Sequence, residues 1–118
     1  MQIPKTFDNL IDTANTHQLY KKLIHQLNKD FLYANIDLKF DENISPDNMK
    51  KELHRTVYDL IEKRFADYLN LLYVIDVSEE KIKQLKENDS FRLSEKVTFL
   101  ILLREWQKVW FKKQYSQK

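Results

Sequence analysis

SEKVTFLILLREWQKVWFKKQY, residues 94–115, is the stretch that decides the fold. At the helical period of 3.6 residues, its apolar side chains form two stripes on different sides of one helix. A helix that is apolar on two sides must be covered on both, so we expect either the central helix of a bundle or a helix at a subunit interface. The first stripe holds Phe99, Leu102, Leu103, Trp106, Val109 and Trp110, and the second holds Leu93, Val97, Ile101, Phe111 and Tyr115.

Upstream of this stretch, apolar residues recur at helical spacing as well. The clearest helix start is Ser45-Pro46-Asp47, because serine caps free amides, proline suits the first helical position and aspartate complements the helix dipole. The fold predicted is an all-α, up-and-down bundle of three to four helices, in a single domain over residues 1–118. The pattern predicts a short helical lead-in over 6–14 and main helices over 16–33, 46–76, 79–88 and 94–115.

Between the first two main helices, Ile36, Leu38 and Phe40 alternate with charged residues at a period of two. One such segment without a partner strand cannot form a sheet, so we expect an extended strap over the helices; the alternative is an edge strand that pairs with another chain. Residues 35–48 carry a net charge of −3, whereas residues 94–118 carry +4. The charge difference suggests that the strap docks on the basic C-terminal helix, within one chain or across two.

The composition excludes several classes of site. The 118 residues contain no glycine, which excludes glycine-rich phosphate loops, dinucleotide-binding turns and G-x-S-x-G nucleophile elbows. The absence of cysteine excludes thiolate chemistry and fits a reducing compartment. The longest strongly apolar run, residues 97–103, is far shorter than the about 20 residues of a membrane span, and no secretory signal is visible. We expect a cytoplasmic protein, and the excess of lysine over arginine suggests an AT-rich bacterial genome.

The chemistry-bearing side chains show no catalytic or metal-binding arrangement. His17, His25 and His54 have no metal-ligating partner at i−3, i+3 or i+4, so we name no metal and no cofactor. The serines at 45, 78 and 94 are better explained as helix caps than as nucleophiles, because no adjacent base and orienting group can be recognised. An enzyme is therefore the less favoured class of function.

Arg64 lies near the centre of the apolar stripe of the predicted helix over 46–76. An unpaired buried charge is costly, so the residue either extends its guanidinium to a nearby surface or forms a buried ion pair. We name Glu105, Asp30 or an acid of the strap as the candidate partner.

The leading functional hypothesis is a non-catalytic protein–protein interaction module that self-associates, most simply as a homodimer. The last helix has more apolar surface than three helices of this size are expected to cover. The candidate interface consists of Val97, Ile101, Phe111 and Tyr115, with Arg104 beside them. The alternative is a nucleic-acid-binding protein that contacts phosphates through Arg104, Lys108, Lys112 and Lys113. A third hypothesis is a helper subunit of a larger complex.

Overall fold

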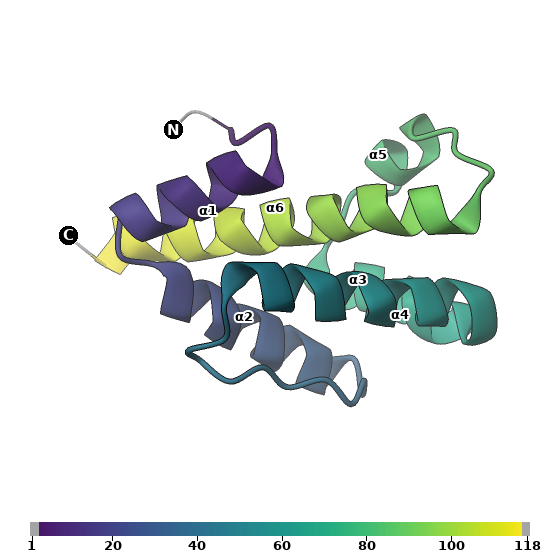
Figure 1. The fold of residues 1–118 in the computed structure, drawn as a ribbon, viewed down its shortest axis with the longest axis horizontal. Helices are drawn as coiled ribbons and strands as arrows, with labels where there is room; N and C mark the ends of the chain where they lie inside the picture. Colours follow the sequence, from purple (N-terminus) through teal and green to yellow (C-terminus); the bar gives the residue numbers. More distant parts are fainter. Residues whose placement is uncertain (1–2, 117–118) are drawn as a thin grey trace.

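The computed structural model describes residues 3–116, and these form six α-helices and no β-strand (Figure 1). The all-α prediction is confirmed, but the helices outnumber the three to four expected, because the lead-in is a full helix and the long second helix is divided. The helices are α1 (Phe7–Thr16), α2 (Tyr20–Tyr33), α3 (Pro46–Lys63), α4 (Phe65–Ile75), α5 (Glu79–Gln84) and α6 (Ser90–Ser116).

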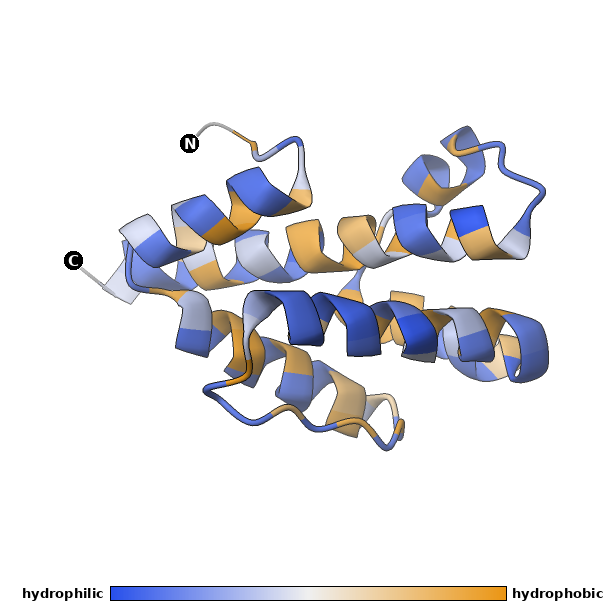
Figure 2. Cartoon of the chain, in the orientation of Figure 1, coloured by the Kyte–Doolittle hydropathy of each residue, from blue (hydrophilic) through white to orange (hydrophobic). Residues whose placement is uncertain are grey.

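The helix α6 runs the length of the molecule and contacts α1, α2, α3 and α4 (Figure 1). Its middle turns are the most hydrophobic part of the helix (Figure 2). Both predicted stripes contribute to the core, since Val97, Ile101, Leu102 and Trp106 are all buried. Of the two roles expected for this helix, the structure therefore shows the central one. No helix in the described part of the chain is long and apolar enough to cross a membrane.

The predicted continuous helix over 46–76 is wrong, because the chain reverses direction at Arg64. This residue leaves the helical conformation (φ −141°, ψ 60°), and α4 runs back behind α3 (Figure 1). The Arg64 side chain is 54% exposed and forms an ion pair with Asp67, three residues later, at 2.7 Å between Nε and Oδ2. The prediction of a buried ion pair at Arg64 is therefore wrong as well, because the reversal carries its side chain to the surface.

Three helices end without glycine in a turn that normally favours it. Gln18, Asn35 and Asp76 adopt positive φ angles of 57°, 59° and 69° directly after α1, α2 and α4. In each case the amide after that residue donates to a carbonyl five positions back, for example Leu19 to Ala14 at 2.8 Å. This is the hydrogen-bond pattern of a Schellman motif. Asparagine and aspartate tolerate this backbone region better than most residues, whereas glutamine has no such advantage.

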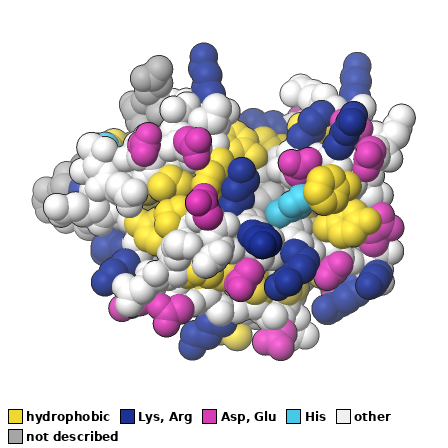
Figure 3. All heavy atoms as spheres, viewed as in Figure 1, with side chains coloured by type: hydrophobic (Ala, Val, Ile, Leu, Met, Phe, Trp, Pro, Cys, Tyr) yellow, Lys and Arg dark blue, Asp and Glu magenta, His cyan; other side chains and the backbone are white. Residues whose placement is uncertain are grey.

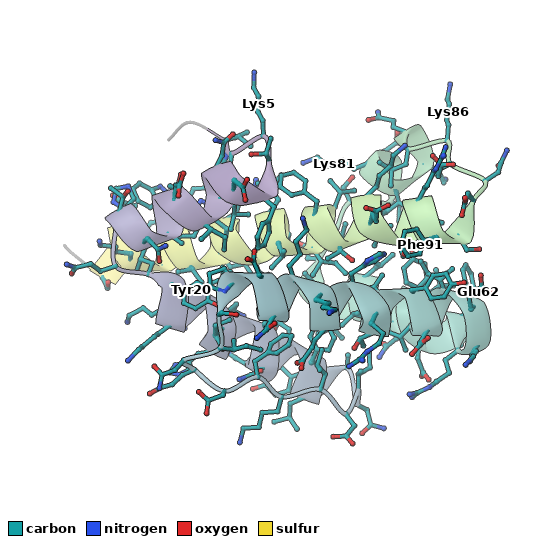
Figure 4. All side chains as sticks on the ribbon, in the orientation of Figure 1. Lys5, Tyr20, Glu62, Lys81, Lys86 and Phe91 are labelled. Atoms are coloured by element: carbon teal, nitrogen blue, oxygen red, sulfur yellow. The ribbon has the colours of Figure 1, made fainter. Side chains whose placement is uncertain are left out.

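The segment between α2 and α3 is a strap within one chain and not a strand. Asn28 of α2 holds it with two hydrogen bonds: its Nδ2 donates to the Phe40 carbonyl (2.9 Å), and the Phe40 amide donates to its Oδ1 (2.8 Å). The Tyr20 hydroxyl donates to the Ile44 carbonyl at 2.6 Å (Figure 4). The one ion pair found for the strap in residues 3–116 joins Glu42 to His25 of α2. The strap thus docks on α2 and not, as the charge difference suggested, on the basic helix.

Three predicted helix ends also move. The helix α2 begins at Tyr20 instead of 16. The helix α5 ends at Gln84 instead of 88, and the backbone turns left-handed at Lys86 (φ 49°). The last helix begins at Ser90 instead of Ser94, because Asp89 already caps it by accepting the Phe91 amide at 2.8 Å. Ser94 is buried inside the helix, so it is not a cap.

Candidate functional site

A groove with a volume of about 620 Å³ lies between α2 and the C-terminal half of α6, and we call it the lysine groove. Four lysines and two histidines line it, and no acidic side chain does. Its floor is apolar where Leu19 and Val109 are buried. The lining residues are His17, Gln18, Leu19, Lys22, His25, Gln26, Lys29, Val109, Lys112, Lys113 and Ser116.

Helical spacing places the lysines in the groove. Lys22, Gln26 and Lys29 follow one another at i, i+4 and i+7 and therefore share one face of α2. Opposite them, Lys113 donates from Nζ to the carbonyl of His17 at 3.2 Å, which ties the end of α1 to α6. The His17 ring packs edge-on against Trp110, with ring centroids 4.6 Å apart. These two contacts hold the end of α1 against α6 at one end of the groove.

Beside the groove lies a buried pair of carboxyl groups, Asp30 of α2 and Glu105 of α6. Asp30 Oδ2 accepts from Lys108 Nζ at 2.8 Å and from Gln26 Nε2 at 3.1 Å, and Gln26 also lines the groove. Lys108 Nζ lies 3.1 Å from Glu105 Oε1. One lysine thus faces two acids in the interior.

The environment separates the pKa values of these two acids. Burial raises the pKa of Glu105 from 4.5 to about 9, and its hydrogen bond and charge repulsion with Asp30 add to the effect. Burial also acts to raise the pKa of Asp30, but hydrogen bonds from Glu105, Lys108 and Gln26 outweigh it and lower that pKa below 3.8. At neutral pH Glu105 is therefore protonated and Asp30 is ionised. The protonated Glu105 donates a hydrogen bond to the Asp30 carboxylate. Lys108 and Asp30 then form the ion pair.

The four residues of the nucleic-acid alternative do not form one surface. Arg104 donates from Nε to the carbonyl of Asp76 and from Nη2 to its carboxylate, both at 3.1 Å, and so fastens the end of α4 to α6. Lys108 is held by Asp30. Lys112 and Lys113 alone reach the lysine groove. The sequence missed the groove's other two lysines, because they lie on α2 and only tertiary packing brings them to α6.

The candidate subunit interface is also divided. Val97 and Ile101 are fully buried under the other helices, so this part of the prediction is wrong for the folded chain. Phe111 and Tyr115, further along α6, are exposed, and Arg104 is partly covered by its contacts with Asp76. The first half of the second stripe is therefore buried in the core, and its last two turns are exposed.

A different apolar surface is exposed on α4, which has one charged residue, Asp67, among its eleven. Phe65, Leu69 and Tyr73 follow one another at i, i+4 and i+8 and are between 52% and 84% exposed. We call these three residues the α4 stripe. Sequence analysis missed it because it treated 46–76 as one helix with one stripe. The run of eleven residues over 65–75 with a single charge is the sequence signal that could have indicated this exposed apolar surface.

One histidine–serine pair resembles a fragment of a catalytic site. His54 Nε2 lies 2.7 Å from Ser94 Oγ, but Ser94 is fully buried and donates its hydroxyl to the Phe91 carbonyl at 2.7 Å. The His54 ring also packs edge-on against Phe91, at the start of α6 (Figure 4). The pair therefore fastens α6 to α3 and is not a nucleophile. Within residues 3–116, no group of three or more His, Cys, Asp or Glu residues could hold a metal ion.

Comparison with known proteins gives no family or relative for this chain. No protein-family model, no curated protein and no solved structure matches it.

Proposed function

We propose that the protein is a non-catalytic module that self-associates, with the α4 stripe as the contact between two copies. The observation that carries the proposal is the exposure of Phe65, Leu69 and Tyr73 on a helix with one charge in eleven residues. Helices that are apolar all round are normally covered on every side. In the single chain, α4 is covered by its neighbours only on the face of Tyr68, Leu71, Leu72 and Ile75.

The area of the surface fits a second copy. Two more exposed apolar side chains, Leu32 and Tyr33, lie at the end of α2 that contacts α4, where Asn70 Nδ2 donates to the Ala34 carbonyl at 3.4 Å. At roughly 200 Å² per large side chain, the exposed fractions of these two and the stripe amount to roughly 650 Å² per copy. Two copies would bury roughly 1,300 Å², within the range of specific interfaces.

The shape and charge of the stripe also favour an identical partner. In a two-fold dimer the same patch meets itself, so a patch without charges avoids the like-charge contacts that symmetry would otherwise impose. Leu69 stands at the centre of the stripe and would meet its own copy near the two-fold axis. The face in Figure 3 carries basic and acidic side chains interspersed with apolar patches.

Sedimentation equilibrium at high micromolar concentration tests the proposal. We expect the wild type to form a dimer and Leu69→Asp to be a monomer with an almost unchanged melting temperature, because the Leu69 side chain is half exposed in the single chain. Tyr73→Asp is the second variant, since Tyr73 is 84% exposed and its replacement does not disturb the core.

The matched control is Phe111→Asp, which introduces the same charge at an exposed apolar residue of α6. We expect this variant to remain a dimer. A monomeric wild type contradicts self-association. If Phe111→Asp dissociates the dimer and Leu69→Asp leaves it intact, the interface lies at the end of α6 and not on the α4 stripe. Because the chain has no cysteine, Leu69→Cys gives an independent readout: a disulfide-linked dimer on mild oxidation.

A further inference from the structure

The lysine groove concentrates positive charge that the protein does not neutralise. No acid in residues 3–116 is paired with Lys22 or Lys112, and Lys29 contacts only the Tyr33 ring, 5.9 Å from its centroid. Asp30, which accepts a hydrogen bond from Gln26 of the groove, is already paired with Lys108, and the Glu42 carboxylate lies 3.1 Å from His25 Nε2. Four ammonium groups around one concave site repel one another, so the groove is a place where an anion would be stabilised.

The size of the groove indicates what kind of anion fits. A volume of about 620 Å³ lies within the range of small-molecule sites, roughly 300 to 1,000 Å³. The basic surface does not continue along α6, because Asp76 holds Arg104 and Asp30 holds Lys108. A nucleic-acid strand needs charge along a track, and this charge is confined to one end of the molecule. The site therefore favours a compact ligand with several negative charges.

The chemistry of the lining narrows the ligand further. Lysine is a compact point charge that commonly binds phosphate, and the groove offers four from two helices. The side-chain amide of Gln18 adds a hydrogen-bond donor, and Leu19 and Val109 form an apolar floor. We propose that the lysine groove binds a small molecule that carries at least two phosphate groups. The groove shares no residue with the α4 stripe, although Lys29 contacts Tyr33 at the edge of the proposed interface. Different variants test the two sites, so either proposal can fail without the other.

Isothermal titration calorimetry with inorganic tripolyphosphate tests the proposal on the full chain at low salt. We expect saturable binding at one site per chain, and much weaker binding of orthophosphate. The double variant Lys22→Gln/Lys112→Gln removes one lysine from each wall and should weaken tripolyphosphate binding by about tenfold or more, because contacts to charged groups are among the stronger ones. Both side chains are exposed, so the variant should melt like the wild type.

The matched control is Lys63→Gln/Lys83→Gln, which removes the same charge from two exposed lysines outside the groove. We expect its affinity to stay within about twofold of the wild type when both are compared at about 0.15 M salt, because the Debye length is then about 8 Å and more distant exposed charges are screened. Equal weakening in both double variants would overturn the proposal, because the attraction would then be to net charge alone. The absence of any tripolyphosphate binding would overturn it too.

Two further probes identify the source of the phosphate. If the apolar floor holds a base, adenosine triphosphate should bind more tightly than tripolyphosphate. If the ligand is a polyphosphate, the two should bind equally tightly. Both results support the site. A single-stranded oligonucleotide that binds more tightly than both, with an affinity that falls steeply with salt, would replace the small ligand by nucleic acid and overturn the proposal.

Discussion

Replacing Glu105 by glutamine should make the protein more stable at neutral pH. Glu105 is fully buried, and its pKa is raised from 4.5 to about 9. The folded chain therefore keeps a proton on this carboxyl at pH 7, whereas the unfolded chain releases it above pH 4.5. Glutamine has nearly the same shape, needs no proton, and its amide can donate to Asp30 in place of the protonated carboxyl.

The sign and size of the effect follow from linkage. Between pH 4.5 and 9 the folded state binds more protons than the unfolded state, so the free energy of unfolding falls as the pH rises through this range. At pH 7, about 2.5 pH units above the unfolded pKa, the cost is about 3 kcal/mol, and by pH 9 it is about 6 kcal/mol. The lowered pKa of Asp30 acts in the opposite direction and at lower pH: it stabilises the fold above pH 3.8, and this stabilisation is lost on acidification.

Urea unfolding near pH 5, 7 and 9 measures the effect. The wild type should lose stability steadily across this range, while Glu105→Gln should change little and exceed the wild type by up to about 3 kcal/mol at pH 7. Glu95→Gln, an exposed acid on the same helix, is the control and should follow the wild type within about 0.5 kcal/mol. If Glu105→Gln and the wild type have parallel pH profiles, Glu105 does not hold a proton in the folded state and the reasoning is refuted.

Two other changes test local features of the fold by thermal or urea unfolding. Gln18→Gly should stabilise the protein by about 0.5 kcal/mol, because glutamine occupies a left-handed position (φ 57°) that glycine adopts without steric cost; a destabilised variant would contradict this. Tyr68→Phe should be neutral or stabilising, since the Tyr68 hydroxyl is buried with no hydrogen-bond partner in residues 3–116, whereas Tyr20→Phe removes the 2.6 Å bond to the Ile44 carbonyl and should cost about 1 kcal/mol. Equal changes in the free energy of unfolding in the two tyrosine variants would contradict the expected difference between a bonded and an unbonded hydroxyl.

Local signals in the sequence predicted the local structure well. The Ser45-Pro46 start of α3 is observed as expected, with the Ser45 hydroxyl accepting the Asn48 amide. The period-two strap was recognised, because its alternation buries Ile36 and Phe40. In each case the residues that determine the structure are neighbours in the sequence.

The features that sequence analysis missed depend on contacts between distant segments. The reversal at Arg64 uses neither proline nor glycine, and the apolar pattern passes through it without a gap, so only the packing of α4 against α2 and α3 reveals it. The lysine groove is likewise made from α2 and α6, whose lysines are about ninety positions apart. A pattern along one helix cannot show which other helix will face it.

The misplaced interface and the buried carboxyl have one physical cause. The sequence pattern predicts apolar stripes on two sides of α6 and offers Glu105 only as a candidate partner of Arg64. Burial and the neighbouring Asp30 carboxylate raise the pKa of Glu105, so Glu105 is neutral in the fold and lies buried with Trp106. The central part of α6 is therefore enclosed by the other helices on most sides, and Phe99 and Leu100 remain only partly buried. The exposed apolar surface is found instead on α4, which lies at the outside of the bundle with only one charged side chain to solvate it.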